Sequence, residues 1–195
     1  MAKLYFRYGA MGCGKTMQLL QVAFNYEERG HKVCVIKPAT DTKNGTKLLT
    51  RIGPERETDF CFDRKTDLFK KISQKYKDVH CVLVDESQFL TPKQVDQLEL
   101  VAIKLNIPVI AYGLRINFRQ DSGGFEGSTR LLQIAEDIEE IKTICECGRK
   151  ATRNTRFLND KLVIEGPDIL IDDGSSKIEY RALCSACYQK YLEEK

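Results

Sequence analysis

The sequence predicts an α/β fold, with a P-loop NTPase-like parallel sheet flanked by helices and a small zinc-binding domain. Three observations support this prediction. Apolar strand-like segments alternate with helical segments over residues 1–113, which is typical of a parallel sheet with helical crossovers. A glycine-rich loop at residues 9–16 separates the first strand from the first helix. Two pairs of cysteines lie within residues 145–187.

Four apolar segments predict the strands of the main sheet. They are residues 4–8, 32–37, 79–85 and 107–112. Residues 79–85 are apolar almost throughout, as in strands that are buried on both faces of a parallel sheet. The segments between the strands therefore have to supply the crossovers that connect them.

Three helices are predicted between these strands. Residues 15–29 are followed by Gly30, a residue that commonly ends helices. Residues 66–77 form an amphipathic pattern. The third helix begins at Thr91-Pro92-Lys93-Gln94, which matches a capping box with proline at the first helical position. The apolar face of that helix consists of Val95, Leu98, Val101, Ala102 and Leu105.

The remaining segments define the expected domain organisation. Residues 40–65 are polar and contain glycine and proline, so we expect mostly loop there, and residues 114–127 read as a second loop. Residues 128–144 continue the α/β pattern, which ends after Thr143. We therefore expect a P-loop nucleotide-binding domain over 1–143, and a zinc-binding domain with a C-terminal tail over 144–195.

The composition of the chain restricts its environment and its partners. With 195 residues, 42% of them hydrophobic, the chain has enough material for one sizeable core and a small appendage. The net charge of +3 does not suggest a nucleic-acid partner. The sequence has no apolar run of the roughly 18 residues that span a membrane, and no pattern of a secretory signal. We expect a cytoplasmic protein that binds no membrane.

The run Gly9-Ala10-Met11-Gly12-Cys13-Gly14-Lys15-Thr16 fits the phosphate-loop pattern G-x-x-x-x-G-K-[S/T]. Glycines allow successive backbone N–H groups to point at phosphates, and the helix N-terminus adds positive potential. Lys15 would contact the β- and γ-phosphates of ATP, and the Thr16 hydroxyl would bind Mg²⁺. The alternative is a glycine-rich turn with an incidental lysine, but the flanking strand and helix favour the phosphate loop.

Two adjacent carboxylates, Asp85 and Glu86, end the apolar segment 79–85. In P-loop proteins a carboxylate at such a strand end holds Mg²⁺, often through water. Because the carboxyl ends of parallel strands share one edge of the sheet, we expect Asp85 near the phosphate loop. The side chains of adjacent strand residues point in different directions, so the second carboxylate is available as a general base. The alternative is a pair of solvated charges.

The cysteines Cys145, Cys147, Cys184 and Cys187 form two pairs that are separated by 36 residues. Four thiolates suit a closed, tetrahedral structural zinc site. The second pair has the common spacing of two intervening residues, whereas the first has only one. The alternative is four reduced thiols without a metal.

Together these residues resemble the thymidine kinases of the P-loop, zinc-containing type (type II), over almost the whole chain. The resemblance rests on the order and spacing of several motifs. They are Gly9–Thr16 with Met11 in third place, Asp85-Glu86-Ser87-Gln88-Phe89, Tyr112-Gly113-Leu114-Arg115 with Phe118-Arg119, the two cysteine pairs, and Tyr180 four residues before Cys184.

The resemblance implies an ATP- and Mg²⁺-dependent transferase that phosphorylates the 5′-hydroxyl of thymidine in nucleotide salvage for DNA synthesis. It implies that Glu86 is the base, that Asp85 and Thr16 lie on the Mg²⁺ side, and that a lasso-like loop between the cysteine pairs closes over the nucleoside. It further implies a homotetramer, and it leaves open whether deoxyuridine is a second acceptor. The walls of the thymine pocket would be Met11, Phe89, Leu114, Phe118, Phe125 and Tyr180.

The sequence departs from the family pattern in three places. Lys43 stands where an arginine is expected to contact phosphate, so a bidentate contact becomes a point charge. Residues 172–176 replace the glycine pair that is expected before Tyr180, and Phe125 lies two residues later than expected. The last two departures affect the nucleoside contacts.

Two other functions remain alternatives on the sequence alone. A nucleic-acid-stimulated ATPase with a zinc ribbon would explain the phosphate loop and the cysteines, but it predicts a strong excess of basic residues. A nucleotide sensor without catalytic activity would explain the phosphate loop, but it has no use for Glu86.

Overall fold

The computed structural model describes residues 1–40, 45–50, 52–119, 124–167 and 177–194. Its centre is a six-stranded parallel sheet in the order β5-β2-β6-β7-β1-β8. The strands are β1 (Leu4–Gly9), β2 (Val33–Pro38), β5 (Phe60–Phe62), β6 (Cys81–Val84), β7 (Val109–Leu114) and β8 (Asp137–Ile141). The fold class expected from the sequence is therefore confirmed.

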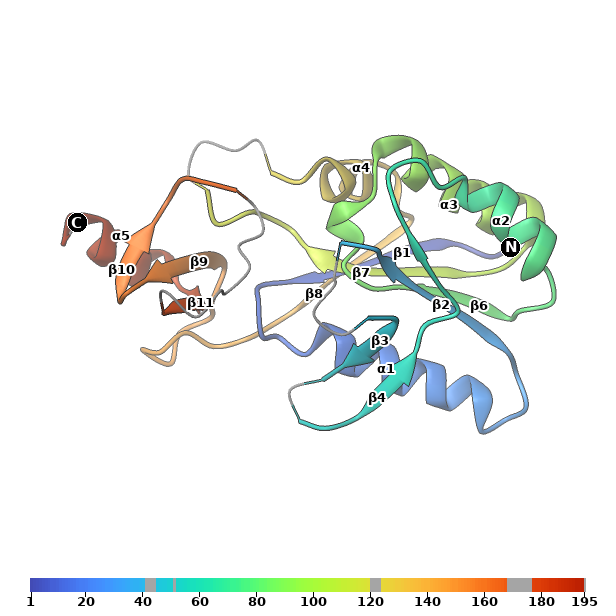
Figure 1. Cartoon of the computed structure of the whole chain (residues 1–195), viewed down its shortest axis with the longest axis horizontal. Coiled ribbons are helices and arrows are strands. Elements are labelled where there is room, and N and C mark those ends of the chain that lie inside the picture. Colours follow the sequence, from blue (N-terminus) through green and yellow to red (C-terminus); the bar gives the residue numbers. More distant parts are fainter. Residues whose placement is uncertain (41–44, 51, 120–123, 168–176, 195) are drawn as a thin grey trace.

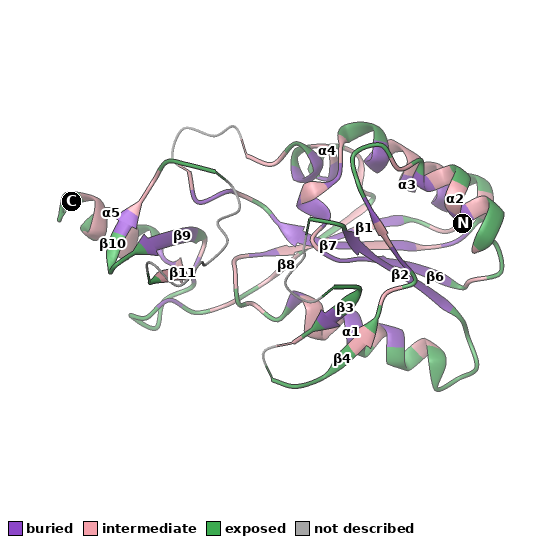
Figure 2. Ribbon diagram, in the orientation of Figure 1, coloured by how far each residue is buried: buried purple, intermediate pink, exposed green. Residues whose placement is uncertain are grey.

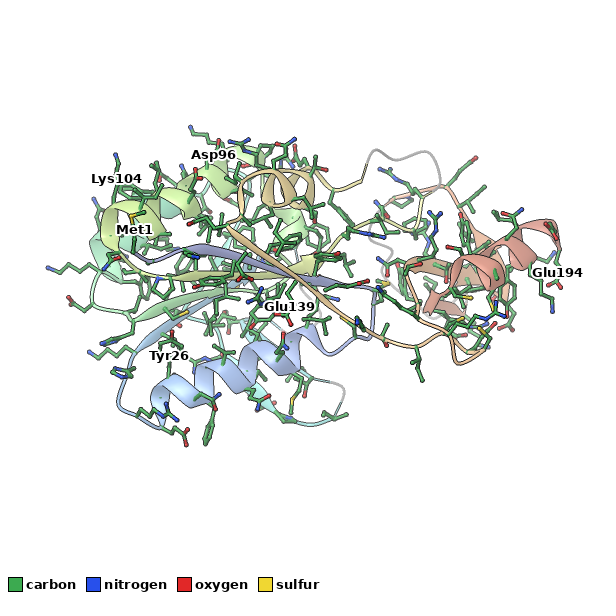
Figure 3. All side chains as sticks on the ribbon, turned by 180° about the vertical axis from the view of Figure 1, so that it is seen from behind. Met1, Tyr26, Asp96, Lys104, Glu139 and Glu194 are labelled. Carbon is green, nitrogen blue, oxygen red and sulfur yellow. The ribbon has the colours of Figure 1, made fainter. Side chains whose placement is uncertain are left out.

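Helices cover both faces of this sheet (Figure 1). Figure 3 shows α1, which carries Tyr26, on one side of the sheet and α3, which carries Asp96 and Lys104, on the other. α1 packs its apolar face on Val33, Val35 and Leu83 of the sheet. On the opposite face of the sheet, α2, α3 and α4 pack around a second apolar cluster. The helices are α1 (Lys15–Glu27), α2 (Leu68–Lys75), α3 (Pro92–Leu105) and α4 (Glu126–Ile134).

The start of α3 has the predicted capping box. The Thr91 side chain accepts a hydrogen bond from the Gln94 N–H at 3.2 Å, and the Gln94 side chain accepts one from the Thr91 N–H at 3.0 Å. The helix buries Val95, Leu98, Val101 and Ala102, while Leu105 is half-buried. The central strands are the most continuously buried part of the chain (Figure 2).

The prediction that residues 40–65 are mostly loop holds for the described residues of this segment, but three short strands that the sequence did not predict interrupt the loop. Two short strands, β3 (Lys47–Leu49) and β4 (Glu55–Glu57), form a hairpin that lies on the α1 side of the sheet (Figure 1). β5 adds an edge strand to the main sheet beside β2. Its buried residues, Phe60 and Phe62, alternate with Cys61, but a strand of three residues is too short to show a clear period in the sequence.

The C-terminal part of the chain forms a second, smaller unit at one end of the molecule (Figure 1). A three-stranded antiparallel sheet in the order β10-β9-β11 packs with α5 around a small cluster that includes Phe157, Leu162 and Leu183. The elements are β9 (Arg153–Leu158), β10 (Lys161–Val163), β11 (Ile178–Leu183) and α5 (Ser185–Glu193). The domain boundary at residue 143 stays a prediction. In the described part of the chain, no helix is long and apolar enough to cross a membrane.

Candidate active site

The phosphate loop connects β1 to α1, and its glycines permit a backbone that other residues rarely adopt. Gly12 and Gly14 have φ angles of 72° and 84°, in the left-handed region where glycine has no steric penalty. A Cβ atom on Gly9 would lie 2.4 Å from Cys13 Sγ and 2.5 Å from the Ile141 carbonyl oxygen. The local fold of this loop therefore depends on the glycines that the sequence pattern identified.

The N-terminus of α1 is electrostatically suited to an anion. It has no side-chain cap and no acidic residue in its first turn, so its N–H groups and its positive dipole end stay available. Lys15 is buried and donates a hydrogen bond from Nζ to the Ala10 carbonyl oxygen at 3.0 Å. The ammonium group is thus held over the loop, where it can interact with phosphates.

Asp85 lies beside the phosphate loop, although β7 separates β6 from β1 in the sheet. Its Oδ2 atom accepts a hydrogen bond from Thr16 Oγ1 at 2.9 Å, and its Oδ1 atom accepts one from the Glu86 N–H at 3.0 Å. The pKa of Asp85 is raised to about 7, mainly by burial and next by the neighbouring Glu86 carboxylate, while the hydrogen bonds from Thr16 and the Glu86 N–H and the charge of Lys15 oppose the shift. A hydroxyl and a carboxylate oxygen at this distance are the donor atoms that Mg²⁺ prefers.

Glu86 lies across a cavity from the phosphate loop. Its φ angle of 48° is left-handed, which is uncommon for a residue with a side chain and is concentrated at functional sites. The cavity has a volume of about 470 Å³. It is lined by residues from four regions: Met11, Gly12, Gly14, Lys15, Thr16 and Met17; Leu49, Thr50 and Ile52; Glu86 after β6; and Leu114 at the end of β7.

Gln88 is a residue of this site to which the sequence assigned no role. It lies in the 3₁₀ helix η2 (Ser87–Phe89) and is 2% exposed. Its Nε2 donates a hydrogen bond to Glu86 Oε2, and its Oε1 accepts one from the Leu114 N–H at 3.0 Å. One amide thus holds the carboxylate of Glu86 and the end of β7. The only signal in the sequence was the position of Gln88 within the motif of residues 85–89.

The residues predicted to surround thymine are distributed over three places. Met11 and Leu114 line the cavity with Glu86. Phe89 and Phe125 contact each other edge to face, with 5.7 Å between ring centroids. Phe118 is buried, and the guanidinium of Arg156 stacks on its ring at 3.9 Å.

Tyr180 is the remaining predicted wall residue, and it lies on β11 directly opposite Arg156 on β9. Opposed residues of antiparallel strands point to the same face of the sheet. Tyr180 therefore faces the same side as the guanidinium that stacks on Phe118. Two departures from the family pattern, Lys43 and residues 172–176, lie outside the described residues.

The four cysteines come together in the small unit. Their Sγ atoms all lie within 4.8 Å of one another, and the Cys147 and Cys184 sulfurs are 3.6 Å apart. A tetrahedral zinc site with Zn–S bonds of about 2.3 Å places its sulfurs roughly 3.8 Å apart, so the arrangement fits zinc. The Cys187 N–H donates to Cys184 Sγ at the N-terminus of α5. This bond, together with the contacts to the three other thiols, lowers the pKa of the Cys184 thiol to about 7, which favours the thiolate that a metal binds, while the contacts among these thiols raise the pKa of Cys187 to about 12.

This fold and this site define a P-loop nucleotide-binding protein with a four-cysteine cluster of the zinc type. The model of the family described as thymidine kinase matches residues 2–189. The chain belongs to the thymidine kinase family and is an enzyme that phosphorylates thymidine. The family resemblance of the sequence motifs is therefore confirmed.

Bacterial relatives support this assignment. A thymidine kinase of Chromobacterium violaceum is 47% identical over 96% of this chain and 98% of its own length. Those of Francisella tularensis and Coxiella burnetii are 43% and 50% identical over 99% and 80% of this chain, and over 98% and 81% of their own lengths. Among solved structures, Bacteroides Pif1 bound to ssDNA superposes with a TM-score of 0.41 and 15% identity over 71% of this chain and 38% of that chain, which carries no functional argument.

Proposed function

We propose that the enzyme transfers the γ-phosphoryl group of ATP, bound with Mg²⁺, to the 5′-hydroxyl of thymidine, and that the products are dTMP and ADP. The observation that carries this proposal is that one and the same cavity is lined by the phosphate loop, Glu86 and Leu114. The proposed role is nucleotide salvage for DNA synthesis, in the cytoplasm and as a homotetramer, as the family resemblance implies.

The phosphate loop holds the donor in this proposal. The N–H groups of residues 9–16 and the N-terminus of α1 bind the phosphates, and the Lys15 ammonium offsets the charge of the β- and γ-phosphates. Thr16 and Asp85 hold Mg²⁺, which when bound neutralises charge on the transferring group. The hydrogen bond of 2.9 Å between these two side chains shows that they are already adjacent.

Glu86 acts as the general base for the acceptor. Its carboxylate faces the cavity and accepts the hydrogen bond from Gln88, so its direction is fixed before the substrate arrives. The carboxylate takes the proton of the 5′-hydroxyl while the oxygen attacks the γ-phosphorus. Phosphoryl transfer needs mainly positioning and charge stabilisation, and these residues supply both.

The acceptor pocket lies at the side of the cavity that Met11 and Leu114 line, and its further walls follow the family pattern. These further walls are Phe89, Phe118, Phe125 and Tyr180. The four cysteines hold structural Zn²⁺ and thereby fix the ends of the segment that closes over the nucleoside. Because the proposed walls are mostly apolar, deoxyuridine, which lacks only a methyl group, is a weaker second acceptor.

A screen of nucleosides as acceptors from γ-labelled ATP tests this function. We expect label on thymidine, less on deoxyuridine and none on purine nucleosides. The same preparation is assayed for ATP hydrolysis with and without DNA or RNA. Hydrolysis that nucleic acid stimulates, without transfer to any nucleoside, would overturn the proposal.

A further inference from the structure

Asn154, on β9 of the small unit, contacts two loops of the large unit at once. Its Oδ1 atom accepts a hydrogen bond from the Met11 backbone N–H at 2.8 Å. Its Nδ2 atom donates one to the Ile116 carbonyl oxygen at 2.7 Å. The side chain is 4% exposed, and only this orientation of the amide satisfies both partners.

The two partners of Asn154 lie on opposite parts of the proposed active site. Met11 is the third residue of the phosphate loop, which extends toward the small unit (Figure 1). Ile116 follows β7 by two residues, directly beyond Leu114, which lines the cavity with Glu86. Asn154 therefore joins the loop that holds the donor to the segment that faces the acceptor.

The phosphate loop is held from two sides at adjacent residues. Lys15 binds the Ala10 carbonyl oxygen from within the large unit, and Asn154 binds the Met11 N–H from the small unit. The cavity beside this contact measures only about 10 Å³, at the lower limit for a single water molecule. The contact is therefore direct, with almost no room for water beside it.

The same face of β9 makes a second contact with the large unit. Arg156, two residues after Asn154, stacks on Phe118 and donates hydrogen bonds to the Glu165 and Pro167 carbonyl oxygens at 2.8 and 2.7 Å. Residues at positions i and i+2 of a strand point to one face. This face of β9 is thus the surface through which the small unit meets the segment after β7.

We propose that Asn154 is a positioning residue that fixes the phosphate loop relative to the segment after β7, and so makes the geometry of the donor site depend on the small unit. The inference rests on the proposed function only where it concerns catalysis. The hydrogen bonds themselves can be tested without any substrate. A residue of this kind acts through the loop, and it does not touch the reacting atoms.

The test compares Asn154→Leu with Thr155→Val. Leucine has the same branched shape but provides neither hydrogen bond. Thr155 is the neighbouring residue on the other face of β9, is equally buried, and donates from Oγ1 to the Arg181 carbonyl oxygen at 2.8 Å within the small unit. Both variants lose one buried polar side chain, but only Asn154→Leu loses a contact with the phosphate loop.

The first measurement is hydrogen exchange at the Met11 amide, by NMR and without ligands. We expect exchange at least about tenfold faster in Asn154→Leu and unchanged in Thr155→Val, because only the former removes the acceptor. An unprotected Met11 amide in the wild-type protein would overturn the inference. The exchange rate of the wild-type protein tests the inference even if Asn154→Leu does not fold.

The second measurement is steady-state kinetics of both variants, with zinc content and melting temperature recorded. We expect kcat/KM for ATP to fall about tenfold in Asn154→Leu and less than twofold in Thr155→Val. Equal losses in the two variants would reduce Asn154 to a structural role and refute the inference. If no nucleoside is phosphorylated by the wild type, the proposed function fails, while the exchange data still test the contact.

Discussion

The two units of this enzyme are stabilised by different means. The large unit surrounds its sheet with helices and buries apolar side chains on both faces of the central strands. The small unit has one small cluster, and two of its members, Cys145 and Cys184, belong to the metal site. Figure 2 shows the same contrast, with long buried strands in the large unit and mostly exposed or half-buried residues in the small one. A unit of that size needs metal or other cross-links to be stable.

The proposed chemistry is divided unevenly between the two units. The phosphate loop, Asp85, Glu86 and Gln88 all belong to the large unit, at the carboxyl ends of its strands. The small unit contributes Asn154 and Arg156, which contact the phosphate loop, Ile116 and Phe118 of the large unit, and Tyr180 as a proposed wall of the nucleoside pocket. We therefore expect substitutions in the large unit to abolish phosphoryl transfer. Substitutions in the small unit should instead disturb the geometry of the site and lower the stability of the protein.

The largest effect is expected from Glu86→Gln. Glutamine keeps the shape and can still accept the hydrogen bond from Gln88, but it cannot take a proton. We expect kcat to fall about a thousandfold, within the usual range for loss of a general base. Binding of ATP and thymidine, measured by calorimetry, should stay within about threefold, because the pocket is unchanged.

Glu126→Gln is the matched control for this prediction. Glu126 is an exposed carboxylate on α4 that pairs with Arg64 at 2.5 Å, and surface pairs contribute little. Its kcat should match that of the wild type. If Glu86→Gln keeps more than about a tenth of the wild-type turnover, Glu86 is not the base.

Loss of the zinc site should unfold the small unit and leave the large unit folded. In Cys184→Ser the site loses a ligand, so we expect zinc to be lost and the small unit to unfold. The amides of β9 should then exchange rapidly while those of β6 stay protected, and activity should fall about a hundredfold, because the Asn154 contact and the proposed closing segment between the cysteine pairs are lost. Zinc analysis and exchange measurements check this result.

Cys61→Ser is the control for the cysteine prediction. Cys61 lies in β5 of the large unit, half-buried and outside the four-cysteine cluster, so its loss should leave the zinc content unchanged. Full zinc occupancy in Cys184→Ser would contradict the assigned ligand set. Simultaneous loss of protection in β6 would show that the units are not stabilised separately.

A smaller effect is expected from Gln88→Leu. Leucine cannot donate to Glu86 or accept from the Leu114 N–H, so the base loses its fixed direction and a buried N–H loses its partner. We expect kcat to fall about tenfold to thirtyfold with little change in KM for ATP, because the phosphate loop is not touched.

Gln94→Leu provides the comparison for Gln88→Leu. Gln94 is equally buried, and its Nε2 donates to the Asp63 and Thr66 carbonyl oxygens at 2.7 and 3.0 Å. It supports the start of α3, away from the cavity, so its loss should lower the melting temperature and leave kcat nearly unchanged. Equal kcat in Gln88→Leu and the wild type would show that Gln88 does not orient Glu86 for catalysis.

The two units also differ in how much of them the sequence could predict. In the large unit, long apolar strands, one capping box and the phosphate loop gave the right order of elements. The strand β5 was missed because Phe60-Cys61-Phe62 is short and lies in a polar segment. In the small unit, the strands were not predicted, because the sequence between the cysteine pairs is mixed and the cysteines alone indicated a folded unit.

The site was predictable where a residue acts through its own chemistry. Lys15, Asp85, Glu86 and the cysteines carry groups whose function follows from charge or metal affinity. Gln88 and Asn154 carry ordinary amides, and their importance comes only from the partners that the tertiary fold places within hydrogen-bond distance. Such partners are distant in sequence, so no local pattern marks them.

The smallest effect, and the one that tests the electrostatics of the large unit, concerns Asp85 in the absence of magnesium. Because burial raises its pKa in the folded protein to about 7, the folded state binds more protons than the unfolded chain between pH of about 4 and 7. The free energy of unfolding should therefore fall as the pH rises through this window. Asp85→Asn has no such proton to lose, so in magnesium-free buffer it should melt roughly 4 °C or more above the wild type at pH 8. At a pH of about 4, the lower end of this window, the difference in melting temperature should nearly vanish. If the difference is instead the same at both pH values, burial does not destabilise charged Asp85, and bound magnesium has no such penalty to relieve.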